Sequence, residues 1–319
     1  MKRLFIGLLA SAGLVACSSP KEVVRLNGAG ATFPAPLYTA WFQELAKGEK
    51  FLVNYQAVGS GAGVRQYNAG TIDFGASDKA IPDKKIEHPV VQIPMTGGAI
   101  VPAYNLPGCQ VAMTQKELAD VFLGKITNWS EFGCKDSKIV VVYRSDGSGT
   151  TAGFTSSLSA FSPEWKEKVG SGKAVKWPVG VGNKGNSGVA ATISQQVGAI
   201  GYLNYGYVVG GKFQQVALEN KAGEFVLADA DTSAAGLSQI KLDDQLRGSD
   251  PNPAGENAYP IVSLTWILAH PEHPSNETMQ KVFTYMLSDE AQSQADKHGY
   301  VPLPKSIIDK ALAKVNSLK

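Results

Sequence analysis

Glycine-rich turns between strand-like apolar runs and helix starts recur along this chain, and this pattern restricts the fold more than any other feature. Such turns follow the apolar runs at residues 23–26, 51–55 and 140–143, and each leads into a segment that can be helical. Strands and helices that alternate in this way build an α/β fold with mainly parallel sheets, in which ligands bind at the carboxyl ends of the strands. We therefore predict an α/β fold with its site at these turns.

The turn after the third run reads Arg-Ser-Asp-Gly-Ser-Gly-Thr-Thr and suits an oxyanion. A helix start has unpaired backbone N–H groups and a partial positive charge, so Ser148, the Gly149 N–H and Thr150 could hold an anion there. Arg144 adds a planar, two-pronged donor. Asp146 would repel an anion unless it holds Arg144 in one orientation, which is the role we assign to it. A polar turn with a helix cap has the same residue types and is the alternative.

The two earlier turns also place hydroxyl groups at helix starts. Thr32 and the Phe33 N–H stand at the first, and Ser60 stands at the second. Helix capping and packing explain each of these turns equally well when it is taken alone. Asp73 comes next, in a short strand that passes into a turn, where an aspartate is most often a turn former.

A fourth glycine-rich turn covers residues 180–188. Gly180 and Gly185 have the spacing of a nucleotide-binding phosphate loop, but Asn186 stands where that loop requires lysine. We interpret the segment as a structural turn, and a wall of the binding cleft is the alternative.

The N-terminus predicts export. A short basic start is followed by an apolar segment, residues 4–15, that is too short to span a bilayer. Residues 14–17, Leu-Val-Ala-Cys, resemble the bacterial lipoprotein signal, in which the cysteine becomes the lipidated first residue; a plain signal peptide is the alternative. We expect residues 1–16 to be removed, residues 17–21 to form a tether, and lipid on Cys17 to anchor the protein to a membrane surface outside the cytoplasm.

The charge balance limits the partners. The chain has 30 lysine and arginine residues against 28 acidic residues, and loss of Lys2 and Arg3 with the signal would make it neutral. A neutral chain has no broad basic field, so we expect no nucleic-acid binding and only local recognition of anions.

Histidines and cysteines are too few for a metal site or a disulfide scaffold. His270 and His273 flank an apparent loop, only two further histidines exist, and we expect neither a metal nor a cofactor. Cys109 and Cys134 are the only cysteines besides Cys17. A disulfide between them and two free buried thiols are both compatible with an exported protein.

Two strand-like segments suit crossings between domains, near residues 97–103 and 258–265. They divide the chain into a discontinuous lobe I, residues 22–98 plus 263–319, and a lobe II, residues 99–262.

Several of these signals occur together in one known family. The order and spacing of residues 28–36, 59–61, 73–78 and 144–150, followed by 175–178 and 198–202, closely resemble those of the periplasmic phosphate-binding proteins of bacterial phosphate ABC transporters. The resemblance implies the two-lobed periplasmic-binding-protein fold of type II, with a hinge that lets the lobes close on one phosphate. It also implies a non-enzymatic monomer outside the cytoplasm, whose partners are inorganic phosphate, permease subunits and an ATPase complex. Gly61 departs from the family pattern, in which a second serine is common.

The resemblance also assigns ligand roles by position. Lobe I would supply Thr32, the Phe33 N–H, Ser60 and Asp73, and lobe II would supply Arg144, Ser148, the Gly149 N–H and Thr150, with Asp146 behind Arg144. A carboxylate tolerates an anion that can donate a proton to it, and phosphate at neutral pH carries one whereas sulfate does not. We therefore predict that Asp73 rejects sulfate.

Two other functions remain open. An esterase or phosphatase could use Ser148 as nucleophile, but the outer glycines of the nucleophile elbow are missing and no histidine lies in a motif that marks a base. A surface phosphate sensor or scavenger without a transporter is the other alternative, since docking surfaces have no readable motif.

Overall fold

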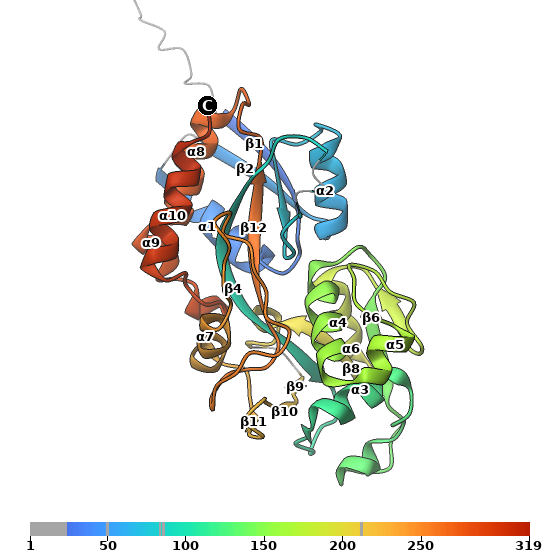
Figure 1. Cartoon of the computed structure of the whole chain (residues 1–319). Helices are drawn as coiled ribbons and strands as arrows, with labels where there is room; N and C mark the ends of the chain where they lie inside the picture. The colour runs from blue at the N-terminus through green and yellow to red at the C-terminus, as the bar shows by residue number, and fades with distance from the viewer. Residues whose placement is uncertain (1–23, 49–50, 83, 85–86, 211–212) are drawn as a thin grey trace, which may run out of the picture.

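A computed structural model describes residues 24–48, 51–82, 84, 87–210 and 213–319 (Figure 1). The predicted signal peptide, the tether and Cys17 lie outside the described residues. Within the described ranges, the helices are all too short or too polar to cross a membrane.

A mixed nine-stranded sheet runs through the molecule. Its order is β2-β1-β3-β12-β4-β8-β6-β7, with β9 also paired to β4. The bounds are β1 Val24–Gly30, β2 Phe51–Ala57, β3 Phe74–Ser77, β4 Val91–Tyr104, β6 Val140–Arg144, β7 Val181–Asn183, β8 Ala199–Asn204, β9 Gln214–Gln215 and β12 Val262–Ala269. Pairing is parallel at each end of the sheet, around β1 and around β6, and antiparallel in the middle, where β12 and β4 lie. A small second sheet contains β5 Ala112–Met113, β10 Ala217–Glu219 and β11 Phe225–Val226.

Strand β4 passes from one half of the sheet to the other. Its residues 91–99 pair with β12, and its residues 100–104 pair with β8. Figure 1 shows β4 running from the upper half of the molecule into the lower half, with β12 beside it. The chain therefore changes its pairing partner within β4, between Ala99 and Ile100, and the division into lobes stays a prediction. We keep the names lobe I and lobe II, with their predicted bounds, for the two halves.

Helices cover the sheet in both halves. The helices within the predicted bounds of lobe I are α1 Ala35–Gly48, α2 Ser60–Asn68, α8 Asn276–Met286, α9 Asp289–Gln292, α10 Lys305–Asn316 and the 3-10 helix η4 Asp296–His298. Those within the predicted bounds of lobe II are α3 Gln115–Leu123, α4 Gly149–Phe161, α5 Pro163–Lys168, α6 Gly185–Gln195, α7 Ala230–Ser238, η2 Trp129–Phe132 and η3 Tyr205–Tyr207. Helix α7 packs on β4 and β12. Helix α2 packs on β1 and β3, and α6 packs on β6 and β8. Local sequence sets several helix ends: Thr114 and Glu117 form a capping box at the start of α3, and the helix stops at the left-handed Gly124.

Aromatic rings fill the core of each half. Tyr55 and Phe74 stack in lobe I, with ring centroids 6.3 Å apart. In lobe II, Phe154 and Tyr202 stack at 4.3 Å. These rings anchor β2, β3, α4 and β8, the elements that lead to the turns described below.

Cys109 and Cys134 are joined by a disulfide, with Cα atoms 5.8 Å apart. This is the first of the two states that the sequence left open. The bond closes a loop with a sequence separation of 25 residues, which should stabilise the fold by about 3 kcal/mol.

Candidate oxyanion site

The glycine-rich turns of the two lobes meet. Ser60 begins α2 in lobe I and Ser148 caps α4 in lobe II. The Gly149 N–H donates to Ser60 Oγ at 3.1 Å, and the Gly61 N–H donates to the Gly147 carbonyl at 2.7 Å. The predicted residues Thr32, Ser60, Arg144, Ser148, Gly149 and Thr150 are all buried where the lobes touch. The structure thus brings together hydroxyl groups and helix starts that are far apart in the sequence.

Three tyrosine hydroxyls fix the turn between β1 and α1. Tyr55, Tyr207 and Tyr300 donate to the consecutive carbonyls of Ala31, Thr32 and Phe33, at 2.7, 2.6 and 2.6 Å. In a trans peptide the N–H points away from the carbonyl, so the Phe33 N–H points away from Tyr207. Within the described ranges, this N–H has no acceptor in the protein. Its role as a ligand donor stays a prediction of the sequence.

Arg144 and Asp146 form the predicted ion pair. The guanidinium donates through Nε and Nη2 to both carboxylate oxygens, at 2.7 and 2.6 Å, and the Gly185 N–H donates to the same carboxylate at 3.0 Å. Burial alone would raise the pKa of Asp146, but the hydrogen bonds and charge of Arg144 lower it below its ordinary value. The third guanidinium nitrogen, Nη1, faces Thr150 Oγ1 at 3.5 Å. Asp146 therefore fixes the orientation of the Arg144 guanidinium, and Nη1 of that group still faces the site.

Asp73 does not belong to this cluster, and its predicted place in the site is wrong. Strand β3 runs parallel to β1, with Gly28 opposite Phe74, so Asp73 precedes β3 at its amino end. The site lies at the opposite, carboxyl ends. The Asp73 carboxylate instead accepts hydrogen bonds from the Asn27 N–H at 2.7 Å and from Ser275 Oγ at 3.0 Å.

Asp78 is the acid that reaches the site, because it follows β3 at its carboxyl end. The residue is only 5% exposed. Thr265 Oγ1 donates to one carboxylate oxygen at 2.9 Å, and Ser60 Oγ lies 3.3 Å from the other. A Cβ atom at Gly149 would lie 2.6 Å from the Asp78 Cβ, so glycine is needed for this approach. Burial raises the pKa of Asp78 to about 7, although Thr265, Arg144, Lys173 and Ser60 oppose the shift.

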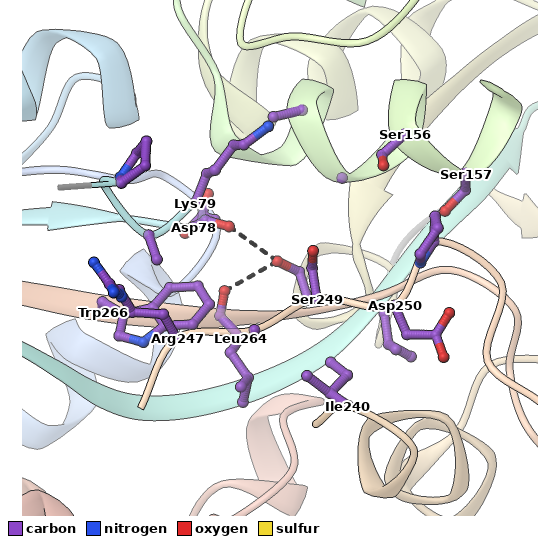
Figure 2. A pocket seen from close by; sticks show the side chains of 18 of the residues that line it. Asp78, Lys79, Ser156, Ser157, Ile240, Arg247, Ser249, Asp250, Leu264 and Trp266 are labelled. Carbon is purple, nitrogen blue, oxygen red and sulfur yellow. Dashed lines mark hydrogen bonds between the residues drawn. The ribbon is translucent and has the colours of Figure 1, made fainter. Parts of the chain in front are cut away.

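A cavity of about 370 Å³ adjoins Asp78 on the side of α4 and β12 (Figure 2). Ser156 and Ser157 of α4 line one wall, and Lys79, Leu264 and Trp266 line others. Its walls therefore come from both lobes. Ser263 Oγ donates to the Asp78 carbonyl at 3.1 Å and so fixes the backbone of Asp78 between this cavity and the polar cluster.

Asn186 is a second residue that the sequence argument missed. It is fully buried, and its N–H and Nδ2 donate to Thr32 Oγ1 at 3.1 and 2.8 Å. Nδ2 also lies 3.2 Å from Thr150 Oγ1, and the Asn204 N–H donates to Oδ1 at 3.1 Å. The start of α6 thus faces the site, and Gly185 and Asn186 of the turn at residues 180–188 line it. This was the alternative to the structural turn that we favoured.

Together these groups are suited to bind a small tetrahedral oxyanion. Hydroxyls, backbone N–H groups of helix starts and one arginine point inward from two lobes, and a buried acid stands among them. No group of three metal-ligating side chains occurs within the described ranges. Ser148 Oγ accepts the Thr151 N–H as a helix cap, and no described hydrogen bond links it to a histidine.

Comparison with known proteins assigns the family. A family model described as a PBP superfamily domain matches residues 17–290. The phosphate-binding protein PstS of Pasteurella multocida (strain Pm70) is 39% identical over 309 residues, which cover 92% of this chain and 90% of that protein. The chain belongs to the PstS family. A PstS protein of Methanocaldococcus jannaschii is 34% identical over 346 residues, with 93% of this chain and 87% of that protein covered.

Solved structures share the fold of this PstS-family chain. One is a putative phosphate ABC transporter substrate-binding protein with bound phosphate from Clostridium perfringens, with a TM-score of 0.69 and 19% identity over 88% of this chain and 100% of that one. Another is a human phosphate-binding apolipoprotein, with a TM-score of 0.74 and 21% identity over 90% and 93%. PstS relatives are named as binding proteins and not as enzymes, in agreement with the expected non-enzymatic role.

Proposed function

We propose that this chain binds inorganic phosphate between its two lobes outside the cytoplasm and delivers it to the permease and ATPase of an ABC importer. One observation carries the proposal: buried polar groups of both lobes converge within hydrogen-bond distance of one another around Arg144 and Asp78. The names of the PstS relatives support phosphate as the ligand and transport as the purpose.

The proposed phosphate ligands come from four strand-to-helix turns. They are Thr32, the Phe33 N–H, Ser60, Arg144, Ser148, the Gly149 N–H and Thr150, with Asp146 holding Arg144. Each half supplies donors that only the closed arrangement brings onto one anion, so phosphate would stabilise closure through differential contact.

Asp78 takes over the role first given to Asp73. Hydrogen phosphate can donate its proton to the Asp78 carboxylate, whereas sulfate would place acceptor against acceptor in a dry site. The penalty for such an unpaired buried contact is several kcal/mol. Phosphate would therefore bind and sulfate would be rejected.

The sequence supplies the proposed location. Lipid on Cys17 would hold the mature chain, as a monomer, at a membrane surface. Replacement of Cys17 by serine should release the protein from membranes without changing phosphate affinity, as fractionation and titration would show. Retention of the Cys17→Ser protein at the membrane would contradict the anchor.

Thermal unfolding with different oxyanions tests the ligand. Phosphate and arsenate, which carry an ionisable proton, should raise the melting temperature, and an anion at 100 times its Kd adds about 2.7 kcal/mol to stability. Sulfate should have no effect, and methylphosphonate reports whether a substituent fits. Equal stabilisation by sulfate, or none by phosphate, would overturn the proposal.

A further inference from the structure

Lys173 connects the two lobes at the rim of the site. It lies between α5 and β7 in lobe II, and its Nζ donates to Ser77 Oγ of lobe I at 3.1 Å. Its own carbonyl accepts the Ser148 N–H at 2.8 Å. One residue is thus bonded both to the segment that holds Asp78 and to the residue that caps α4.

The charge of Lys173 acts on the buried acid. Among the described residues, Asp78 faces two cations, Arg144 from β6 and Lys173, and the hydroxyls of Ser60 and Thr265. The charge of Asp78 also raises the pKa of four buried tyrosines, which are Tyr38 of α1, Tyr55 of β2, Tyr207 of η3 and Tyr300. The pKa of each tyrosine is raised by burial, so the tyrosines stay neutral. The carboxylate form of Asp78 is favoured by the hydrogen bonds of Thr265 and Ser60 and by the charges of Arg144 and Lys173. Because Asp146 engages Arg144 through two hydrogen bonds, part of the arginine charge is already offset.

We propose that Lys173 is a positioning and specificity residue, which joins the lobes in the closed state and keeps Asp78 in the carboxylate form that hydrogen phosphate requires. This inference rests on the proposed function. The proposed phosphate ligands include no residue of the segment 170–175, so the inference adds a functional role for that segment.

The bond between Lys173 and Ser77 crosses from one lobe to the other, so it contributes only when the lobes are together. Ser77 does not depend on it for its own hydrogen bonds, because its Oγ also donates to the Lys79 carbonyl at 2.7 Å and accepts the Lys79 N–H at 3.2 Å. Removal of the lysine therefore leaves no unpaired buried hydroxyl at Ser77.

Substitutions of Lys173 and of Ser77, taken together, separate the effect of the interlobe bond from the effect of the charge on Asp78. Lys173→Met should weaken phosphate binding by roughly 5-fold or more, the lower end of ordinary coupling between sites. Asp78 should then become protonated at higher pH, so sulfate binding should begin at higher pH than in the wild type. Ser77→Ala keeps the charge but removes the bond, and it should weaken phosphate binding without moving the pH profile. Lys173→Arg should restore both properties.

The control is Lys176→Met, which removes the same charge from an exposed lysine of the same segment and should change neither property. Calorimetric titrations with phosphate and sulfate across pH 5–9 give the result, and Lys173→Gln serves as a second variant should the methionine protein fail to fold. Unchanged affinity and pH profile in Lys173→Met or Lys173→Gln, with phosphate binding intact in the wild type, would overturn this inference alone. A matching shift in Lys176→Met would also overturn it, since net charge would then suffice. Failure of the wild type to bind phosphate would overturn the proposed function instead.

Discussion

The two ends of strand β3 carry two aspartates with opposite surroundings. Asp73, at the amino end, has a side chain 18% exposed and accepts hydrogen bonds from a backbone N–H and a serine. Asp78, at the carboxyl end, is buried beside Arg144, and burial raises its pKa to about 7. The comparison teaches that position along a parallel strand, and not the residue type, decides which acid can meet a ligand.

The sharpest test of this division exchanges each carboxylate for an amide. Asp78→Asn should lower the preference for phosphate over sulfate by about 100-fold or more, because the amide can donate a hydrogen bond to sulfate and no longer requires a proton from phosphate. Calorimetric titration with each anion measures the ratio.

Asp73→Asn is the matched control, since it makes the same substitution five residues away, at the other end of β3. It should leave the ratio as in the wild type. If the ratio of phosphate to sulfate affinity falls in Asp73→Asn, or is unchanged in Asp78→Asn, the assignment of different roles to the two aspartates is wrong.

Acidification should reproduce part of the Asp78→Asn effect. The pKa of Asp78 lies above that of an ordinary carboxyl, at about 7, so the acid is neutral below that pH and ionised above it. A neutral acid can donate to sulfate. Sulfate affinity should therefore rise as pH falls toward about 7, by up to about 10-fold per pH unit above that pKa, and should level off below it.

Variants again separate the two ends. Asp73→Asn should show the wild-type pH profile, and Asp78→Asn should show a flat one between pH 5 and 8. A sulfate affinity that stays constant with pH in the wild type would contradict the assignment of Asp78 as the proton acceptor.

Most of the fold and much of the site could be predicted, because their signals are local. Glycine turns, apolar runs and the capping box at Thr114 are set by neighbouring residues. The pairing of Arg144 with Asp146 followed from two charges two residues apart. The hydroxyls at helix starts follow from the same kind of signal, since each lies within one turn of the helix that it serves.

The two misses depend on contacts between distant segments. Asp-Phe-Gly-Ala-Ser-Asp contains two acids, and only the pairing of β3 with β1 shows which of them stands at the carboxyl end. The rule that ligands bind at carboxyl ends favours Asp78 once the strand is bounded at Phe74 and Ser77. Asn186 donates a hydrogen bond to Thr32, which is 154 residues away. No sequence pattern in the turn that contains Asn186 predicts that contact. The sequence could not decide between a disulfide and two free thiols for the same reason, because the distance between Cys109 and Cys134 depends on where two loops meet.

The smallest expected effect lies at the amino end of β3, where Asp73 joins β1 to the start of α8 through Asn27 and Ser275. Asp73→Asn keeps one carbonyl oxygen as an acceptor but loses the charge, so we expect a loss of about 1 kcal/mol in unfolding free energy and a melting temperature about 2 °C lower. Thermal unfolding measures this loss. Ser275→Ala should give a similar loss that does not add to the first, because both substitutions remove the hydrogen bond that Ser275 Oγ donates to the Asp73 carboxylate. Phosphate affinity should stay within about twofold of the wild type in both variants. A larger change would show that the amino end of the strand also acts on the ligand, and the division between a structural and a binding carboxylate would then be lost.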